Sequence, residues 1–194
     1  MTLDHVRPSL GRVVCTALAL CLAAAPARAQ EPSGFWASAG LGTGMHQLSC
    51  DVCLGEYNGG WAARVALGGT LSDHLRLGGE VQGWTDGSEG IRSTFLAVAP
   101  TLYWYPSPAR TRYFVMGGVG LARFRASDST DALSASSLGV MLGVGYEVRI
   151  GRAYALTPFA GFSNSFFANL RDDQTLLADV RLTLLHLGLS VTRL

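Results

Sequence analysis

The sequence predicts an all-β fold: a single up-and-down antiparallel transmembrane β-barrel of eight strands, preceded by a cleavable signal peptide. Three observations lead to this prediction. Apolar residues alternate with small or polar ones over long segments, the connections between these segments are alternately long and short, and the chain opens with an export signal.

Residues 1–29 have the composition of a secretory signal peptide. Two arginines precede an apolar run at 13–25, and small residues flank an arginine at 27–29, which matches the cleavage pattern of such peptides. The apolar run is shorter than the roughly 20 residues that a membrane-spanning helix needs. We therefore expect cleavage after residue 29, which leaves 30–194 as one outer-membrane barrel domain.

The composition of this remaining segment is close to neutral. Removing the first 29 residues takes away three arginines and one aspartate and leaves 12 arginines and 13 acidic residues, a net charge of −1. A near-neutral chain gives no reason to expect a nucleic acid or an acidic substrate as a partner.

The clearest alternation runs from Leu138 to Ile150. One face of this segment carries only aliphatic and aromatic side chains, whereas the other carries three glycines, Met141, Glu147 and Arg149. Successive residues of a strand point to opposite faces, so one face is apolar and the other is small or charged. A glycine-rich face with few charges suits the crowded interior of a narrow barrel better than the solvated face of a soluble sandwich.

Seven other segments share this pattern. These segments are about eleven residues long, which matches tilted strands that span a membrane. Closure into a barrel lets every backbone amide form a hydrogen bond within the bilayer. The long and short connections alternate as expected when both termini of the chain lie in the periplasm and the long loops face outward. Pro100 and Pro158 fall within strands, so we expect a bulge or a shifted boundary at each. The predicted strands lie at about 35–46, 60–71, 74–84, 94–105, 112–124, 138–150, 153–163 and 180–193.

Several charged residues fall on the inward face of the predicted strands. An eight-stranded barrel is wide enough only for its own side chains, and buried charges persist when they are paired. We therefore predict a salt-bridged network that plugs the lumen, with a proton or ion path through the same residues as the alternative. The predicted network consists of Arg64, Arg76, Glu80, Glu147 and Arg149.

Cys50 and Cys53 form a C-x2-C pair in the first long loop. A zinc site of four cysteines needs a second pair, and thioredoxin-like chemistry needs a neighbouring βαβ unit, and the sequence offers neither. Because an exported protein meets an oxidising compartment, we expect a local disulfide between these two cysteines. We expect no metal site and no cofactor.

His186 and Ser190 are the candidates for a nucleophile with a neighbouring base. They lie four residues apart on one face of the last predicted strand, but that face points into the barrel, whereas a lipid substrate would lie outside it. No acidic residue stands beside them to orient the histidine. We therefore expect no catalytic residues and no enzymatic activity.

Residues 30–194 resemble the small outer-membrane β-barrel family, the group that includes the OmpA transmembrane domain and OmpX. The segment GGTLSDHLRLGGE at 68–80 is similar to the second hairpin of that family. The segment HLGLSVTRL at 186–194 is similar to the C-terminal signal read by the barrel-assembly machinery, although it finishes on leucine rather than on an aromatic residue. The resemblance implies a monomer in the outer membrane of a diderm bacterium. Its implied partners are outer-membrane lipid and, during insertion, the barrel-assembly machinery.

The function that we expect is a structural or surface-interaction role, in which polar external loops at 125–137 and 164–179 meet an unknown ligand. One alternative is a narrow outer-membrane pore for small solutes, and a second is a lipid-modifying outer-membrane enzyme. A third alternative is a soluble ligand-binding barrel of the lipocalin type. A lipocalin would bury its apolar face around a ligand, whereas here the charges fall on the inside.

The cysteine pair leads to a first testable prediction. Cys50 and Cys53 should be oxidised to each other in protein taken from the cell envelope, because a three-residue step can bring two Cα atoms within the ~4.4–6.8 Å that a disulfide requires. The closed loop is short, so its effect on stability should be small. Thiol labelling of unreduced, denatured protein should leave both cysteines unmodified. Labelling of both would refute the disulfide.

Overall fold

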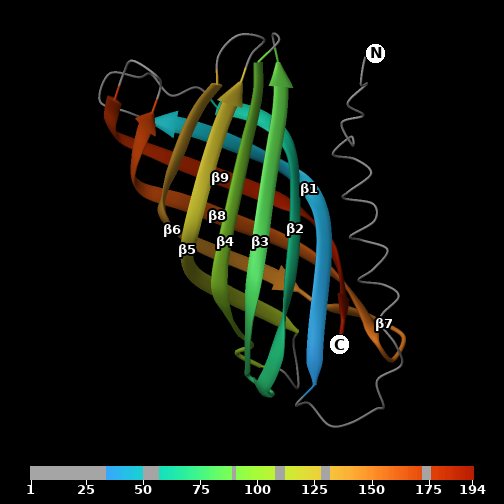
Figure 1. Ribbon diagram of the computed structural model, residues 1–194. Coiled ribbons are helices and arrows are strands. Elements are labelled where there is room, and N and C mark those ends of the chain that lie inside the picture. The colour runs from blue at the N-terminus through green and yellow to red at the C-terminus, as the bar shows by residue number, and fades with distance from the viewer. Residues whose placement is uncertain (1–33, 50–56, 89–90, 108–111, 128–131, 172–175) are drawn as a thin grey trace, which may run out of the picture. The chain divides into compact units, whose positions relative to one another are not determined.

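The computed structural model describes residues 34–49, 57–88, 91–107, 112–127, 132–171 and 176–194. The predicted signal peptide and both loop cysteines lie outside these residues. No helix in the described part of the chain is long and apolar enough to cross a membrane. The strands are β1 Phe35–Ser49, β2 Tyr57–Ser72, β3 Leu75–Ser88, β4 Ile91–Trp104, β5 Tyr113–Ser127, β6 Ala132–Tyr146, β7 Val148–Ile150, β8 Tyr154–Arg171 and β9 Leu176–Arg193 (Figure 1).

These strands form one closed antiparallel barrel. Each of β1 to β5 pairs with the next strand along the chain, β6 pairs with β8, and β8 pairs with β9. Pairing of β1 with β9, from Ala37 opposite Arg193 to Ser49 opposite Arg181, closes the sheet. β7 pairs only with β8 and continues the line of β6, so the wall has eight strands and the predicted fold class is confirmed.

The alternation in the sequence separates the two faces of the wall. On β9, Leu187 and Leu189 are 62% and 54% exposed, whereas His186 and Ser190 are 6% and 2% exposed. The other strands repeat this arrangement, so leucines and valines cover most of the outside, while glycines, alanines, polar residues and a set of aromatic side chains face the lumen. An apolar outside around a partly charged inside is the arrangement of a barrel surrounded by lipid.

Aromatic side chains mark the end of the barrel that carries the short turns. They come from the ends of five strands and are all exposed, as expected for a belt at a membrane–water interface. Two of them, Tyr113 and Tyr146, lie directly opposite each other in the pairing of β5 with β6. The belt consists of Phe35, Trp104, Tyr113, Tyr146 and Tyr154.

The strands extend further toward the long-loop end than the sequence predicted. β8 runs to Arg171 and β9 starts at Leu176, so most of the predicted loop at 164–179 is strand, and so is most of the one at 125–137. An apolar outer face is required only inside the membrane, whereas backbone pairing continues beyond it without that pattern. Arg171 therefore belongs to a strand. Four aspartates of the predicted polar loops, Asp128, Asp131, Asp172 and Asp173, lie outside the described residues.

The prediction of a bulge or shifted boundary at Pro100 is wrong. Pro100 pairs with Gly79 of β3, and the pairing of β4 with β5 is interrupted beside it and resumes in the same register. Pro158 lies where the sixth strand is divided into β6 and β7, and the register is again the same on both sides. Proline removes one ladder hydrogen bond, and here the strand continues without an inserted residue.

Two glycines allow the closing seam to form. Gly42 of β1 lies opposite Gly188 of β9. A Cβ atom on residue 42 would overlap the carbonyl group of Leu187 and the Cα atom of Gly188. At this level of the seam, the backbones of β1 and β9 are therefore too close together for an inward side chain on residue 42. Gly79 of β3, in contrast, is exposed on the outer face, and a Cβ atom added there would have no neighbour within 4 Å.

We expect Gly42→Val to lower the free energy of unfolding by about 3 kcal/mol or more, at or above the upper end of ordinary overpacking costs, because backbone rather than a flexible side chain must move. Gly79→Val is the matched control and should change stability by less than about 0.5 kcal/mol. Urea unfolding of barrels refolded into lipid vesicles, followed by tryptophan fluorescence, measures both. Equal stability of the two variants would contradict the crowded seam.

Candidate functional site

The lumen of the barrel holds the candidate site, and β3 crosses all of its levels. From the short-turn end, the inward side chains of β3 include Arg76, Glu80, Gln82 and Trp84. Strand geometry places these alternate residues on one face, about 7 Å apart for each step of two residues. Arg76, Glu80 with Gln82, and Trp84 belong to three groups of contacts at successive levels of the lumen.

Glu80 is the centre of the first buried group. Its Oε2 atom accepts hydrogen bonds from the Arg64 guanidinium at 2.7 Å and from the Tyr103 hydroxyl, and its Oε1 atom accepts one from the Gln82 side-chain amide at 2.7 Å. Arg64 and Glu80 are 5% and 1% exposed. Gln82 in turn accepts a hydrogen bond from the Ser163 hydroxyl at 2.7 Å. Both oxygens of the buried carboxylate are thus satisfied by donors from three strands.

Glu147 is the centre of a second group, nearer the short-turn end. The Arg76 guanidinium donates to its Oε1 atom at 2.7 Å, and the Tyr105 hydroxyl donates to the same oxygen at 2.8 Å. The Arg76 guanidinium also lies 4.6 Å from the centre of the Tyr105 ring. Arg64 packs in the same way over Phe159. Each arginine therefore combines an ion pair with a cation–π contact.

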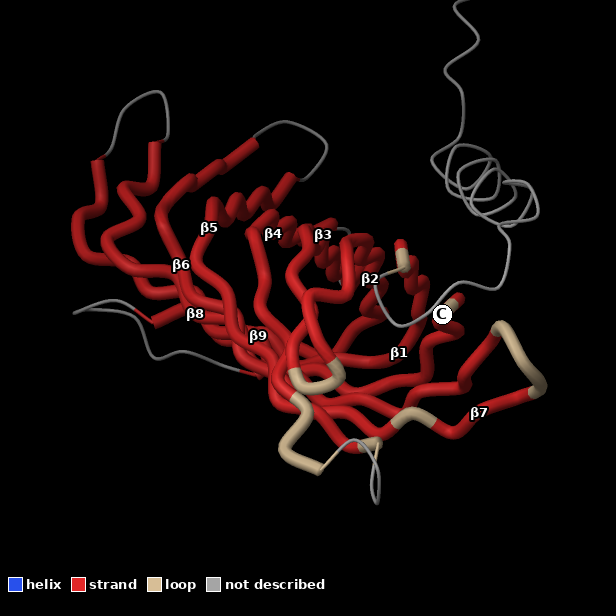
Figure 2. Tube along the Cα trace, turned by 90° about the horizontal axis from the view of Figure 1, so that it is seen from below, coloured by secondary structure: helices blue, strands red, loops and turns tan. Residues whose placement is uncertain are grey.

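Arg149 is placed differently from the sequence prediction. It keeps the inward phase of the sixth strand, but its side chain is exposed, and no salt bridge joins it to another described residue. β7, which carries Arg149, pairs only with β8 and projects past the rest of the wall (Figure 2). Beyond the rim there is no enclosed lumen for an inward side chain to enter. Four of the five predicted charges thus meet in two pairs.

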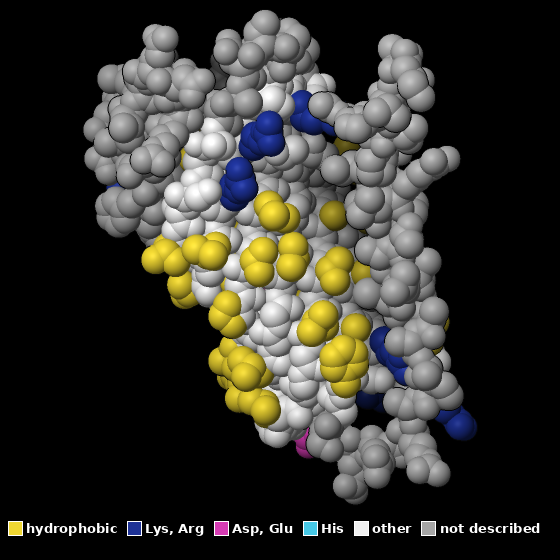
Figure 3. Space-filling model, in the orientation of Figure 1, with side chains coloured by type: hydrophobic (Ala, Val, Ile, Leu, Met, Phe, Trp, Pro, Cys, Tyr) yellow, Lys and Arg dark blue, Asp and Glu magenta, His cyan; other side chains and the backbone are white. Residues whose placement is uncertain are grey.

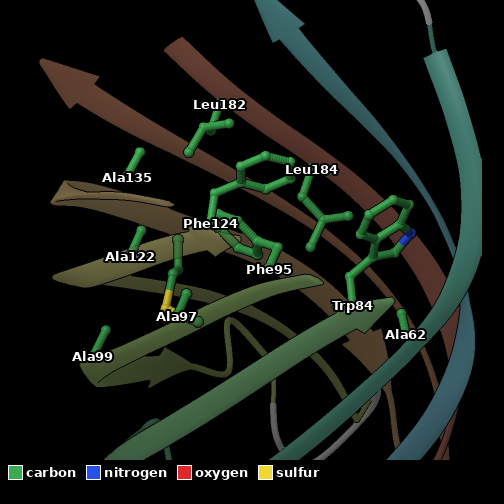
Figure 4. Packing of buried hydrophobic residues seen from close by; sticks show 11 residues of the cluster. Ala62, Trp84, Phe95, Ala97, Ala99, Ala122, Phe124, Ala135, Leu182 and Leu184 are labelled. Carbon is green, nitrogen blue, oxygen red and sulfur yellow. The ribbon is translucent and has the colours of Figure 1, made fainter. Parts of the chain in front are cut away.

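The end of the lumen nearer the long loops is filled by rings and aliphatic side chains. His46 stacks on Phe124, with ring centres 4.8 Å apart and planes at 3°, and on Trp84 at 5.0 Å and 28°. Phe95, Leu182 and Leu184 pack around Trp84 and Phe124 in the enclosed space (Figure 4). The sequence reasoning missed this apolar cluster, although the inward phase of Trp84 was a signal for it.

The candidates for catalysis do not form a nucleophile–base pair. Ser190 donates its hydroxyl to the backbone carbonyl of Thr157 at 3.3 Å. Both ring nitrogens of His186 are buried without a hydrogen-bond partner among the described residues, and its ring lies edge-on to Phe159. The described residues also contain no group of three histidines, cysteines or acidic residues that could hold a metal ion.

The space left around the two ion pairs is small. A cavity of about 10 Å³ lies among residues that include Arg64, Arg76, Tyr103 and Glu147. This is about the volume that a single water molecule needs. The arrangement holds the charges in fixed positions with little space between them.

We expect Glu80→Ala to lower the free energy of unfolding by about 3–5 kcal/mol, because it strands the buried Arg64 charge. Glu147→Ala should cost less, since the Arg76 side chain is 15% exposed and can reach water. Val144→Ala on the lipid face is the control and should cost about 1 kcal/mol. Urea unfolding in lipid vesicles measures all three. A Glu80→Ala barrel no less stable than the Val144→Ala barrel would contradict the buried pair.

Comparison with known proteins supports the same architecture. Residues 14–189 match the family described as outer membrane protein beta-barrel domain. No curated protein sequence matches the chain significantly.

Three solved structures of small barrels are similar to this one. Neisserial surface protein A is 18% identical, with 84% of this chain and 99% of that chain covered and a TM-score of 0.54. Ail of Yersinia pestis, in complex with the heparin analogue sucrose octasulfate, is 15% identical, with 81% and 98% covered and a TM-score of 0.56. A major outer membrane protein from Thermus thermophilus is 16% identical, with 81% and 99% covered and a TM-score of 0.50.

At these identities, the likeness to solved structures concerns the fold alone. The family match is broader, because it covers most of the sequence and includes every described strand except the last residues of β9. The predicted resemblance and the predicted location are both confirmed. The chain belongs to the outer-membrane β-barrel family, and it is a protein of the bacterial outer membrane.

Proposed function

We propose that this protein is a monomeric, non-enzymatic barrel with a closed lumen, and that it serves a structural or surface-interaction role. The observation that carries the proposal is the filling of the lumen at successive levels along β3. The levels are the Arg76–Glu147 pair, the Arg64–Glu80 pair with Gln82, and the stack of His46 on Trp84.

A narrow pore is the first alternative, and the energetics of the lumen weigh against it. A solute would have to separate two ion pairs, of which Arg64–Glu80 is fully buried, and removing a partner from a buried charge typically costs about 3–5 kcal/mol. It would also have to displace stacked rings that come from β1, β3 and β5. Because these obstacles lie in series, opening one level is not enough to form a path.

A lipid-modifying enzyme is the second alternative. Such an enzyme needs an activated nucleophile where its lipid substrate lies, which is the outer face of the wall. The candidates His186 and Ser190 are buried inside the barrel, and Ser190 is hydrogen-bonded to backbone rather than to a base. Between the aromatic belt and the exposed arginines near the long-loop end, the described outer face carries mainly leucine and valine.

Interaction through the outer end is supported by the length of the strands. The outward residues of β5 change from Val119 and Leu121 to Arg123 and Arg125 well before the strand ends at Ser127. β8 and β9 each have 18 residues, more than the roughly 9–11 needed to cross the membrane. The paired strands therefore extend beyond the apolar zone as a rigid base for the outer loops, through which we propose contact with an external ligand.

Two measurements test this proposal. Purified wild-type barrel in a planar bilayer should show no steady current, because the levels that close the lumen act in series. Lipid A from cells with and without the gene should give the same mass spectrum. A steady current that Glu147→Ala changes without lowering stability would make the protein a pore. A change in lipid A that depends on His186 or Ser190 would make it an enzyme.

A further inference from the structure

We propose that the outer face of β4 and β5, near the long-loop end, binds the phosphate groups of lipids in the outer leaflet of the surrounding membrane. Three arginines form this site, Arg92 on β4 and Arg123 and Arg125 on β5. All three side chains are exposed. Basic side chains gather on this face directly above the apolar band (Figure 3).

The pairing of the two strands brings the three arginines together. Leu96 lies opposite Arg123, Thr94 opposite Arg125, and Arg92 opposite Ser127. Arg92 is thus diagonal to Arg125, and diagonal neighbours on one face of a sheet are about 7–8 Å apart, within reach of long side chains. Ser134 and Ser136 of β6 lie opposite Arg125 and Arg123 on the other side. The patch therefore combines guanidinium groups with hydroxyl groups, both of which bind phosphate oxygens.

The height of the patch coincides with the boundary of the apolar layer. Tyr113, in the aromatic belt, and Arg123 are ten residues apart on the same outward face of β5. Ten residues span about 33 Å along a strand. A tilt of about 40° reduces this to about 25 Å across the membrane, which is the usual height of the apolar band. Arg123 thus lies where lipid head groups begin.

The three positive charges lack a counter-charge within the described part of the chain. The salt bridges found there join Arg64 to Glu80 and Arg76 to Glu147, both in the lumen. Like charges this close repel one another, and an anion between them relieves the repulsion. Guanidinium groups bind phosphate in a bidentate way, so a phosphate group is the anion that three clustered arginines suit best.

The surroundings favour a lipid over a soluble anion. Leu96 lies opposite Arg123, Leu121 lies one outward position below it on β5, and Leu138 lies opposite Leu121, and these leucines are 49%, 67% and 62% exposed. A ligand that fits both the leucine surface and the arginine patch places acyl chains against the leucines and phosphate against the arginines. A soluble anion would contact only the arginine patch, and it would have to reach side chains that point sideways toward the membrane.

The test uses the full mature barrel in detergent and measures lipid binding by native mass spectrometry. The probes are lipid A with two phosphates and the same lipid A after dephosphorylation. The wild type should bind the phosphorylated form at least about tenfold more tightly, and Arg123→Gln/Arg125→Gln should reduce that preference to less than about threefold, since charge-assisted contacts carry it. Arg149→Gln/Arg152→Gln removes two exposed positive charges at the opposite end and is the matched control, which should keep the preference.

Three outcomes would overturn the proposal. Equal binding of the two lipids by the wild type would show that phosphate is not recognised, whatever the variants do. Loss of the preference in the control would show an effect of net charge rather than of this patch. Displacement of lipid A by a sulfated oligosaccharide or by inorganic phosphate at similar concentrations would make the ligand a soluble anion. The shift in gel mobility between unheated and boiled samples verifies that each variant is folded.

Discussion

The pairing of β1 with β9 is the interaction on which the rest of this structure depends. A backbone N–H or C=O group without a partner costs several kcal/mol in a bilayer, so a sheet of strands is stable there only when it has no free edge. The ladder from Ala37 to Ser49 removes the two edges at once. It also requires Gly42 and Gly188 at the seam, because a side chain there would hold the two backbones apart. Glycine inside this barrel is thus a requirement of closure as well as of space.

Closure with eight strands also determines the chemistry of the lumen. The enclosed space is so narrow that any inward charge is taken out of water, and it then persists only if it is paired. Glu80 and Glu147 follow this rule, since each accepts hydrogen bonds from one arginine and one tyrosine. Arg149 shows the converse, because a charge outside the enclosed lumen needs no buried partner. It lies past the rim on β7, where no enclosed space exists, and it is exposed.

The period-two pattern made the strands, their faces and the inward position of four charges predictable from sequence. It could not predict which charges would pair. Arg64 lies opposite Gln82 in the sheet but binds Glu80 diagonally, and Arg76 of β3 meets Glu147, between β6 and β7, across the lumen. Contacts across the lumen depend on the stagger and tilt of the whole barrel, which no single strand encodes. The stack of His46 on Phe124 could not be predicted from the sequence for the same reason. The extra length of β8 and β9 was missed because pairing outside the membrane needs no apolar face.

The sequence contains arginine but no lysine. Whether an arginine points into or out of the barrel determines which anion it can contact. On the inward phase, Arg64 and Arg76 each meet a carboxylate from the same chain, and the ion pair helps to fill the lumen. On the outward phase of β5, an arginine at the membrane centre would be destabilising by about 2–4 kcal/mol, whereas near the interface the cost falls to about 0–1. Outward arginines are accordingly absent from the middle of β5 and begin at Arg123. Among the described residues, the carboxylate partners of arginine lie inside the barrel, so lipid phosphates are the anions that we propose for the outward arginines of this face.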